Sequence, residues 1–251
     1  MCRALLYLGQ PVLLDTLLFQ PDSALIRQSY MPKMLHLLNL AGFGLRAWDA
    51  SSHAPEKPFA YGSASLPVFD RNLKNLAEKV RAACVLGHVR GVAYSTTVDI
   101  SLQNVHPFQF EGLPWCLAHN GDLAGIAQIK PLLAQQMKTE FLSQIRGTTD
   151  SEWIYALFVS QLADAAGPAS DRQVFEALEK TLGIIRRARA ARHFAVVVGE
   201  SVHRQRQPAR GAALLLRLRL LPHRRSRARA RGELELSLAL VHARARLRAA
   251  R

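Results

Sequence analysis

The second residue of the chain is a cysteine, and a cysteine at an amino terminus can act as a nucleophile that carries its own base. If Met1 is removed, Cys2 bears a thiol and a free α-amino group on one residue. A thiol titrates near about 8.5 and an α-amine near about 8, so the amine can accept the thiol proton close to neutral pH. The small side chain at position 2 also permits removal of the methionine. The alternative is a cysteine that packs as a small hydrophobic residue and does not react.

Further polar residues follow two apolar segments that we predict to be strands. The segment 84–91 ends in His88 and Arg90, which lie two positions apart and therefore point to the same face of a strand. The segment 113–118 leads directly into residues 119–122, His-Asn-Gly-Asp. A bare Asn-Gly pair is usually a tight turn, so its chemical role depends on the other candidates around it.

A helix start provides another candidate. Residues 148–152, Thr-Thr-Asp-Ser-Glu, have the pattern of a helix cap. Asp150 lies within it as a potential ligand, although capping alone would also explain a carboxylate there. His88, His106 and His119 we expect to be structural, because their spacing and their lack of carboxylate partners do not suit a metal site.

Hydrophobic periodicity predicts the elements that position these residues. The Gly-containing stretch 39–48 suits a strand that another backbone approaches closely. We predict strands at 4–9, 39–48, 84–91 and 113–118, and helices at 12–19, 72–83, 131–141, 153–162 and 171–182.

Length and composition indicate a globular protein. The 251 residues are 49% hydrophobic, which is enough for a buried core. No apolar run approaches the roughly 18 residues that would span a bilayer, and the start does not resemble a signal peptide, so we expect a cytoplasmic protein. Three scattered cysteines do not suggest a disulfide framework, and we expect them to be reduced.

The net charge of +14 is confined to the end of the chain. Residues 1–185 carry seven Lys and eight Arg against 16 Asp and Glu, and are nearly neutral. Residues 186–251 carry 18 Arg and no Lys against three Glu, in an Arg- and Ala-rich sequence. The basic character therefore belongs to an atypical tail and not to the segment with the candidate residues.

Four motifs occur along the chain in one order: Cys2, Gly-His-Val-Arg at 87–90, His-Asn-Gly-Asp at 119–122 and Thr-Thr-Asp-Ser-Glu at 148–152. Together they resemble the class II glutamine amidotransferases, which are N-terminal nucleophile hydrolases. The opening Met-Cys-Arg with Tyr-Leu-Gly, and Asn-Val-His-Pro-Phe at 104–108, are similar in particular to stand-alone members, the hydrolases of ergothioneine synthesis and of glutathione degradation. The resemblance extends over about residues 2–182.

The resemblance implies a catalytic role for three residues. Cys2 would attack the γ-carboxamide carbon of glutamine or of a γ-glutamyl compound, with its own α-amine as the base and later the acid. The side-chain amide of Asn120 and the backbone N–H of Gly121 would stabilise the oxyanion of the tetrahedral intermediate. No cofactor and no metal is implied.

The resemblance also implies how the substrate would be held. Arg90 would bind the α-carboxylate, since a planar guanidinium can contact both of its oxygens. Asp150 would receive the α-ammonium, and His119 would also belong to the substrate-binding set. A solvated charge at the end of a strand is the alternative for Arg90.

The fold implied by the resemblance is α+β, a four-layer α/β/β/α sandwich. We expect a glutamine amidotransferase domain over residues 2–185 and a separate tail over 186–251, so that the sandwich is incomplete or aberrant at its C-terminal edge. In the tail, the segment 194–198 is the one that resembles a strand. The tail composition suggests a shift of reading frame near 182–192, and a genuine basic arm for nucleic acid or anionic lipid is the alternative.

The expected function is hydrolysis of a γ-amide through a Cys2 thioester, releasing ammonia or an amine. No synthetase domain is evident, so a small γ-glutamyl substrate, or a separate synthetase or acceptor subunit, would be the partner. We expect no membrane partner and only non-specific contact with nucleic acid through the tail. The alternative is a non-catalytic remnant whose basic tail binds polyanions.

Overall fold

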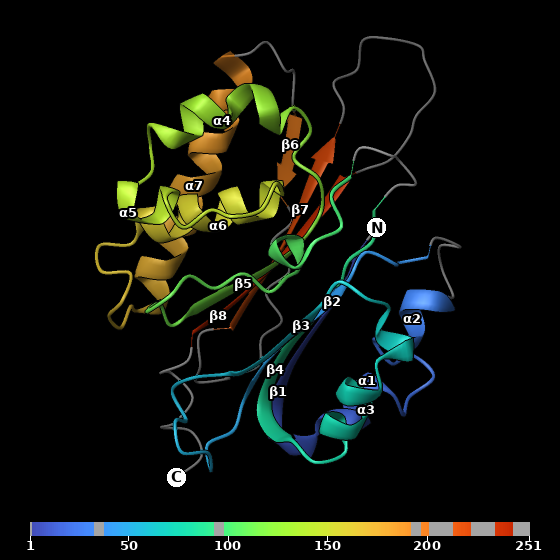
Figure 1. The fold of residues 1–251 in the computed structure, drawn as a ribbon. Coiled ribbons are helices and arrows are strands. Elements are labelled where there is room, and N and C mark those ends of the chain that lie inside the picture. Colours follow the sequence, from blue (N-terminus) through green and yellow to red (C-terminus); the bar gives the residue numbers. More distant parts are fainter. Residues whose placement is uncertain are drawn as a thin grey trace.

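Two antiparallel sheets form the framework of the protein. The structure is a computed structural model that describes residues 2–32, 38–92 and 98–191, and the backbone of 197–200, 213–221 and 234–242. Each sheet has four strands, in the order β1-β4-β2-β3 and β5-β8-β7-β6. The expected α+β class is confirmed, because helices cover both sheets (Figure 1).

The first sheet holds the start of the chain next to the end of a central strand. Arg3 pairs with Val89, Val89 pairs with Phe43, and Phe43 pairs with Ser63, so these four residues mark one end of the sheet. Cys2 lies at this same end. The strands are β1 (Arg3–Leu13), β2 (Phe43–Trp48), β3 (Phe59–Ser63) and β4 (Arg81–Val89).

The second sheet combines one strand of the central chain with three strands of the tail. They are β5 (Trp115–Asn120), β6 (Val197–Glu200), β7 (Ala213–Leu221) and β8 (Leu234–His242), and β5 pairs over its full length with Ser237–His242 of β8. The prediction of one tail strand was wrong, because alternating Leu in the segments around β7 and β8 suits strands. The predicted strand at 194–198 overlaps β6, and residues 192–196 lie outside the described part.

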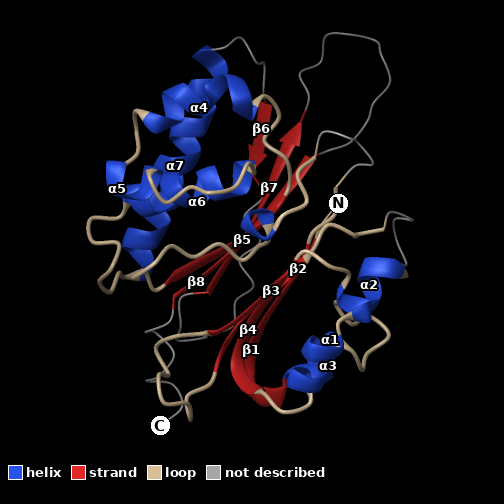
Figure 2. Ribbon diagram, viewed as in Figure 1, coloured by secondary structure: helices blue, strands red, loops and turns tan. Residues whose placement is uncertain are grey.

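Helices pack on the outer face of each sheet (Figure 2). A cluster with Leu14, Leu18 and Leu73 packs α1 and α3 on the first sheet. A larger cluster with Trp115, Ile129 and Phe158 packs α4, α6 and α7 on the second. The helices are α1 (Leu14–Leu18), α2 (Arg27–Tyr30), α3 (Arg71–Ala77), α4 (Ile126–Ala134), α5 (Thr139–Leu142), α6 (Asp150–Gln161) and α7 (Asp171–Ala191), with 3-10 turns η1 (Pro67–Phe69) and η2 (Leu102–Asn104).

A small apolar cluster joins the inner faces of the two sheets. Trp48, Cys84, Leu86, Cys116 and Ala118 form it, and Leu6 packs against it. Since side chains alternate between faces along a strand, the even-numbered residues of β1 up to Leu8, of β4 from Cys84 onward and of β5 point into the space between the sheets. The same alternation directs the residues at the ends of these three strands toward that space.

Several element boundaries differ from the predicted ones. The predicted helix at 72–83 ends at Ala77, because residues 81–89 pair with both β1 and β2. The predicted helix at 131–141 is two helices, α4 and α5, and α4 begins earlier, at Ile126. Helix α7 runs past the predicted end at 182 to Ala191. In these cases tertiary packing overrides the local pattern.

Two features of the fold bear on the sequence predictions. A Cβ atom at Gly44 would collide with the His106 carbonyl oxygen, which confirms that another backbone approaches β2 closely. Within the described part of the chain, no helix has the length and apolar character needed to cross a membrane.

Candidate active site

The Cys2 thiol lies beside the backbone that follows β4. Its Sγ is 3.4 Å from the Gly91 nitrogen, which donates to it, and 3.5 Å from the Gly91 carbonyl oxygen. Burial raises the pKa of the Cys2 thiol, whereas the Gly91 backbone and the Arg90 charge act to lower it. A thiol in this environment needs a base before it can act as a nucleophile at neutral pH.

Arg90 is the residue next to Gly91, and it is also close to Cys2. Its side chain is buried, and its Nη1 donates to the Asp99 carbonyl oxygen at 2.8 Å. Burial lowers the pKa of the Arg90 guanidinium, and the charges of Cys2, Asp99 and Asp150 oppose this effect. The guanidinium stays protonated because its intrinsic pKa is far above neutral pH, and the carboxylates of Asp99 and Asp150 favour its charged form.

Asp150 occupies the first turn of α6, where the helix dipole favours a negative charge. Its Oδ2 accepts a hydrogen bond from the Leu123 nitrogen at 2.5 Å, and its Oδ1 accepts one from the Ser151 hydroxyl at 3.1 Å. A carboxylate has about four acceptor positions, so both oxygens can also accept from a ligand. Capping is done by Thr149, whose hydroxyl accepts from the Glu152 nitrogen at 3.3 Å.

The structure brings three of the predicted residues together. Cys2, Arg90 and Asp150 lie close enough for Arg90 and Asp150 each to affect the pKa of the Cys2 thiol. Asn120 ends β5 and is half-buried, as is Gly121 in the bend that follows. The alternation of side chains along β5 directs Asn120 toward the space between the sheets, the side to which Cys2 and Arg90 also point.

Three buried histidines lie behind this group. The His88 and His106 rings are 4.1 Å apart, and His119 Nδ1 is 2.8 Å from the Ser151 hydroxyl. Burial lowers the pKa of His88 to about 3 and also lowers the pKa of His106 and His119. All three are therefore neutral at physiological pH. Within the described residues, no group of three potential ligands is arranged to hold a metal ion.

Asn104 is a structural residue of this region that the sequence did not single out. It is fully buried, and its amide nitrogen donates to both the carbonyl and the carboxylate of Asp99 and to the Thr148 hydroxyl. Its Oδ1 accepts from the Thr148 nitrogen at 2.8 Å. Asn104 thus connects the segment that contacts Arg90 with the start of α6. The sequence signal was weak, because a polar residue in a loop is normally exposed.

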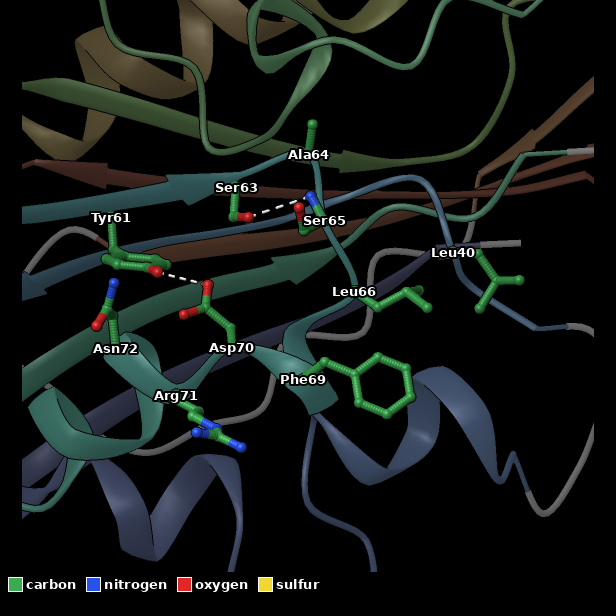
Figure 3. Close-up of a pocket in the computed structure, with 10 residues that line it drawn as sticks. All are labelled: Leu40, Tyr61, Ser63, Ala64, Ser65, Leu66, Phe69, Asp70, Arg71 and Asn72. Atoms are coloured by element: carbon green, nitrogen blue, oxygen red, sulfur yellow. Dashed lines mark hydrogen bonds between the residues drawn. The ribbon is translucent and has the colours of Figure 1, made fainter.

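A separate pocket lies at the other edge of the first sheet. It has a volume of about 790 Å³, and Tyr61 in its wall donates to Asp70 at 2.5 Å (Figure 3). Burial, together with the Asp70 carboxylate, raises the pKa of Tyr61 to about 12. None of the six predicted site residues lines it. Its lining is Leu40, Tyr61, Ser63, Ala64, Ser65, Leu66, Phe69, Asp70, Arg71 and Asn72.

The family of the chain follows from comparison with known proteins. A family model for class II glutamine amidotransferases matches residues 63–242. This is more than half of the chain, which therefore belongs to the class II glutamine amidotransferases, a family of enzymes. The match includes Arg90, Asn120, Gly121 and Asp150 but begins after Cys2.

Two curated relatives are similar to this chain. Probable glutamine amidotransferase DUG3 of Saccharomyces cerevisiae is 34% identical over 168 residues, which are 64% of this chain and 46% of that protein. Gamma-glutamyl-hercynylcysteine sulfoxide hydrolase of Mycolicibacterium smegmatis is 29% identical over 173 residues, which are 66% of each chain. The chain thus matches less than half of the first relative and about two thirds of the second.

A solved structure has a similar fold. The glutamine aminotransferase class-II domain protein from Silicibacter pomeroyi superposes with a TM-score of 0.51 at 18% identity. The alignment covers 95% of this chain and 88% of that one, so it includes both sheets. At this identity the likeness supports the fold alone.

Proposed function

We propose that the protein hydrolyses the γ-amide of glutamine or of a γ-glutamyl compound, with Cys2 as the nucleophile after removal of Met1. The observation that carries this proposal is the position of the Cys2 thiol beside the charges of Arg90 and Asp150. The nucleophile can attack the γ-carbonyl of a γ-glutamyl group, the cation can bind its α-carboxylate, and the anion can bind its α-ammonium. Membership in the class II glutamine amidotransferases supports the same chemistry.

The reaction proceeds in two halves. In the first, the α-amine of Cys2 takes the thiol proton, the sulfur attacks the γ-carbonyl carbon, and the amine returns the proton to the departing ammonia or amine. A γ-glutamyl thioester remains on the sulfur. In the second, water attacks the thioester, glutamate leaves and the thiol is restored. Burial of the thiol makes the intramolecular base necessary, because it raises the pKa of Cys2.

Asn120 and Gly121 act on the oxyanion that forms in each half. Donors that are fixed before the reaction stabilise developing charge, and loss of one donor typically costs about 3 kcal/mol of barrier stabilisation. The Asn120 amide and the Gly121 N–H are such donors at the end of β5. Glycine suits the second position because no Cβ hinders the approach of the substrate.

Arg90 and Asp150 hold the two charged groups on the α-carbon of the substrate. The guanidinium binds the α-carboxylate, and the Asp150 carboxylate binds the α-ammonium. These contacts recognise the γ-glutamyl part and leave the group on the amide nitrogen unspecified. The name of the Mycolicibacterium smegmatis relative mentions a γ-glutamyl compound and that of DUG3 mentions glutamine, which supports this substrate class. A separate acceptor or synthetase subunit remains a proposed partner.

The complete fold that we propose is the four-layer α/β/β/α sandwich, with β6, β7 and β8 as part of the second sheet. The family match runs to residue 242, which supports a structural role for this region. The division at 185 and the shift of reading frame remain predictions. Sequencing of the gene across 182–192 tests the frame shift, which fails if no other frame encodes a family-like continuation.

The direct test is hydrolysis of glutamine and of γ-glutamyl dipeptides by the purified protein, measured as released glutamate. We expect activity that is lost in Cys2→Ala and retained in Cys84→Ala, a matched control in the buried cluster between the sheets. Equal activity of the wild type and Cys2→Ala would contradict the proposal. So would a wild type that has lost Met1 and hydrolyses none of these compounds.

A further inference from the structure

A chain of hydrogen bonds runs from the buried interior to Asp150. Ser151 follows Asp150 in the first turn of α6, and only 3% of its surface is exposed. Its Oγ lies 3.1 Å from Asp150 Oδ1 and 2.8 Å from His119 Nδ1. His119 is 1% exposed and comes from the end of β5, so the contact joins β5, which also carries Asn120, to α6, which carries Asp150.

The direction of these hydrogen bonds follows from the number of protons available. A serine hydroxyl has one hydrogen, and an ionised carboxylate can only accept. The Ser151 hydrogen therefore goes to Asp150, and the proton between His119 and Ser151 must come from Nδ1 of His119. His119 is consequently the Nδ1–H tautomer, and its Nε2 carries no hydrogen. Among the described residues Nε2 has no hydrogen-bond partner, so the contact with Ser151 alone assigns the tautomer.

His119 acts in this chain as a neutral donor. Burial lowers the pKa of His119, while the negative charge of Asp150 acts to raise it. A neutral imidazole with Nδ1–H can donate to Ser151 without adding a positive charge that would compete with the substrate. The Asp150 carboxylate thus keeps its full negative charge for a ligand.

We propose that Ser151 and His119 are positioning residues that orient the Asp150 carboxylate toward the α-ammonium of the substrate. The inference rests on the proposed function and deepens it, because it explains selectivity for substrates with a free α-amino group. Ser151 fixes Oδ1 and the Leu123 nitrogen fixes Oδ2, so the plane of the carboxylate is set from both sides. His119 contacts Ser151 at 2.8 Å and acts on Asp150 through that hydroxyl, whereas the sequence predicted a place for it in the substrate-binding set.

The test compares two chromogenic substrates that differ in the α-amino group, γ-glutamyl-4-nitroanilide and its des-amino analogue glutaryl-4-nitroanilide. We expect Ser151→Ala to lower kcat/KM about tenfold for the γ-glutamyl substrate, mainly through KM, and less than twofold for the glutaryl substrate. Ser151→Thr keeps the hydroxyl and should recover most of the loss. Ser160→Ala, which removes a hydroxyl farther along α6, is the matched control and should behave as the wild type.

The outcomes separate this inference from the proposed function. A wild type that hydrolyses neither the anilides nor glutamine overturns the proposed function, and the positioning role with it. A wild type that hydrolyses glutamine but neither anilide is compared in the same way on glutamine and its des-amino analogue glutaramate. A wild type that is active, with equal losses for the two substrates in Ser151→Ala or no loss at all, overturns the positioning role alone.

The tautomer of His119 gives a measurement that does not depend on activity. In ¹⁵N NMR spectra of histidine-labelled protein, the His119 signals are identified by their absence in His119→Gln. We expect Nδ1 to carry the proton in the wild type and the signal to change in Ser151→Ala but not in Ser160→Ala. A proton on Nε2 in the wild type would overturn the proposed chain of hydrogen bonds.

Discussion

At the scale of single residues, the proposed role of the Arg90 guanidinium is to recognise a carboxylate. It is buried next to Cys2 and anchored through Nη1 to the Asp99 carbonyl. Lysine would keep the charge but lose the planar pair of donors. We predict that Arg90→Lys lowers kcat/KM for glutamine by about 10- to 100-fold, which corresponds to about 1.4–2.8 kcal/mol.

The substrate analogue with an α-carboxamide provides the control for Arg90. It lacks the carboxylate that the guanidinium binds, so wild type and Arg90→Lys should hydrolyse it at similar rates. Steady-state kinetics on both compounds measure the difference. A loss of the same size on the carboxamide would assign Arg90 to the folding of the site and not to recognition of the carboxylate.

The three buried histidines predict how stability depends on pH. Burial lowers the pKa of His88 to about 3, and that of His106 and His119 below the usual value. In the unfolded chain each titrates near about 6.5, so below that pH the unfolded state binds more protons than the folded state. The stabilising contribution is present above about pH 6.5 and decreases toward pH 3, by at most about 1.4 kcal/mol per pH unit for each histidine.

Urea unfolding between pH 5 and 8 measures this effect. We predict that His88→Gln reduces the slope of the unfolding free energy against pH below about pH 6.5. The expected reduction is the contribution of one histidine, at most about 1.4 kcal/mol per pH unit. His53→Gln, in an exposed loop, is the control and should leave the slope unchanged. An unaltered slope in His88→Gln would mean that His88 is protonated in the folded protein.

At the scale of elements, Asn104 fixes the start of α6 relative to the segment that holds Arg90. Its four hydrogen bonds to Asp99 and Thr148 would be lost in Asn104→Ala, leaving buried polar groups unpaired. We predict a decrease of about 2–4 kcal/mol in the free energy of unfolding, measured by urea denaturation. Gln103→Ala, the exposed neighbour, should change it by less than about 0.5 kcal/mol. Equal effects would contradict the assigned role of Asn104.

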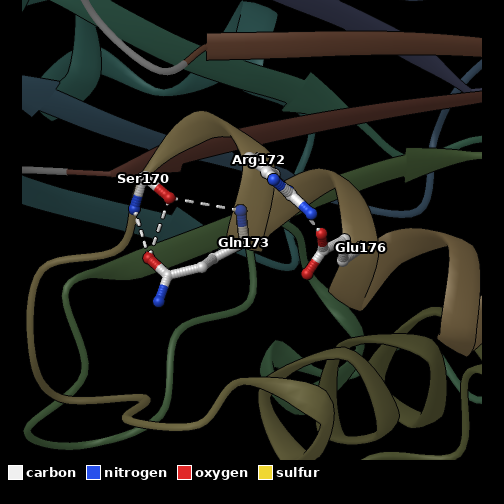
Figure 4. Close-up of polar contacts among 4 residues, drawn as sticks. All are labelled: Ser170, Arg172, Gln173 and Glu176. Atoms are coloured by element: carbon white, nitrogen blue, oxygen red, sulfur yellow. Dashed lines mark hydrogen bonds and ion pairs between the residues drawn. The ribbon is translucent and has the colours of Figure 1, made fainter.

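The starts of α6 and α7 were predicted well because their capping residues act locally, whereas α4 begins five residues before its predicted start. The Thr149 cap of α6 lies within the predicted pattern, and α7 begins at the predicted Asp171. At the start of α7, Ser170 and Gln173 form reciprocal hydrogen bonds, with Arg172 and Glu176 paired at 2.7 Å (Figure 4). Helix ends were predicted less well, because α3 and α7 end where packing requires.

Prediction of the site residues was also limited to those that lie in local sequence motifs. The motif order selected Cys2, Arg90 and Asp150, and the structure places Cys2 Sγ 3.4 Å from the nitrogen of Gly91, the residue after Arg90. The roles of the three residues stay predictions. Asn104 and Ser151 were not selected, because their importance depends on burial and on partners that are distant in the sequence. These contacts join residues more than 30 positions apart, so they form only in the folded chain and leave no local pattern in the sequence.

At the scale of the whole molecule, the tail contributes three of the four strands of the second sheet. Strand β5, which carries His119 and Asn120, pairs with β8. Removal of residues 192–251 would leave β5 without this partner. It would also expose the apolar side chains of α4, α6 and α7 that face the second sheet. We predict that the truncated chain 1–191 aggregates or lacks cooperative unfolding.

Circular dichroism and size-exclusion chromatography of the truncated chain test this role of the tail. A soluble monomer that unfolds cooperatively and keeps the activity of the full chain would instead support a separate domain over 2–185 with an accessory basic tail. The full-length protein, prepared in parallel at the same ionic strength, is the control, because the 15 Arg of residues 192–251 also affect solubility.

The central claim, an N-terminal cysteine nucleophile within an assembled γ-glutamyl site, is tested most directly by intact-mass spectrometry. The purified protein is measured before and after incubation with 6-diazo-5-oxo-L-norleucine, a glutamine-like electrophile, beside Cys2→Ala. We predict loss of the mass of Met1 and a single adduct that is absent in Cys2→Ala, although Cys84 and Cys116 are still present. Retained Met1, or the same labelling in Cys2→Ala, would contradict the account.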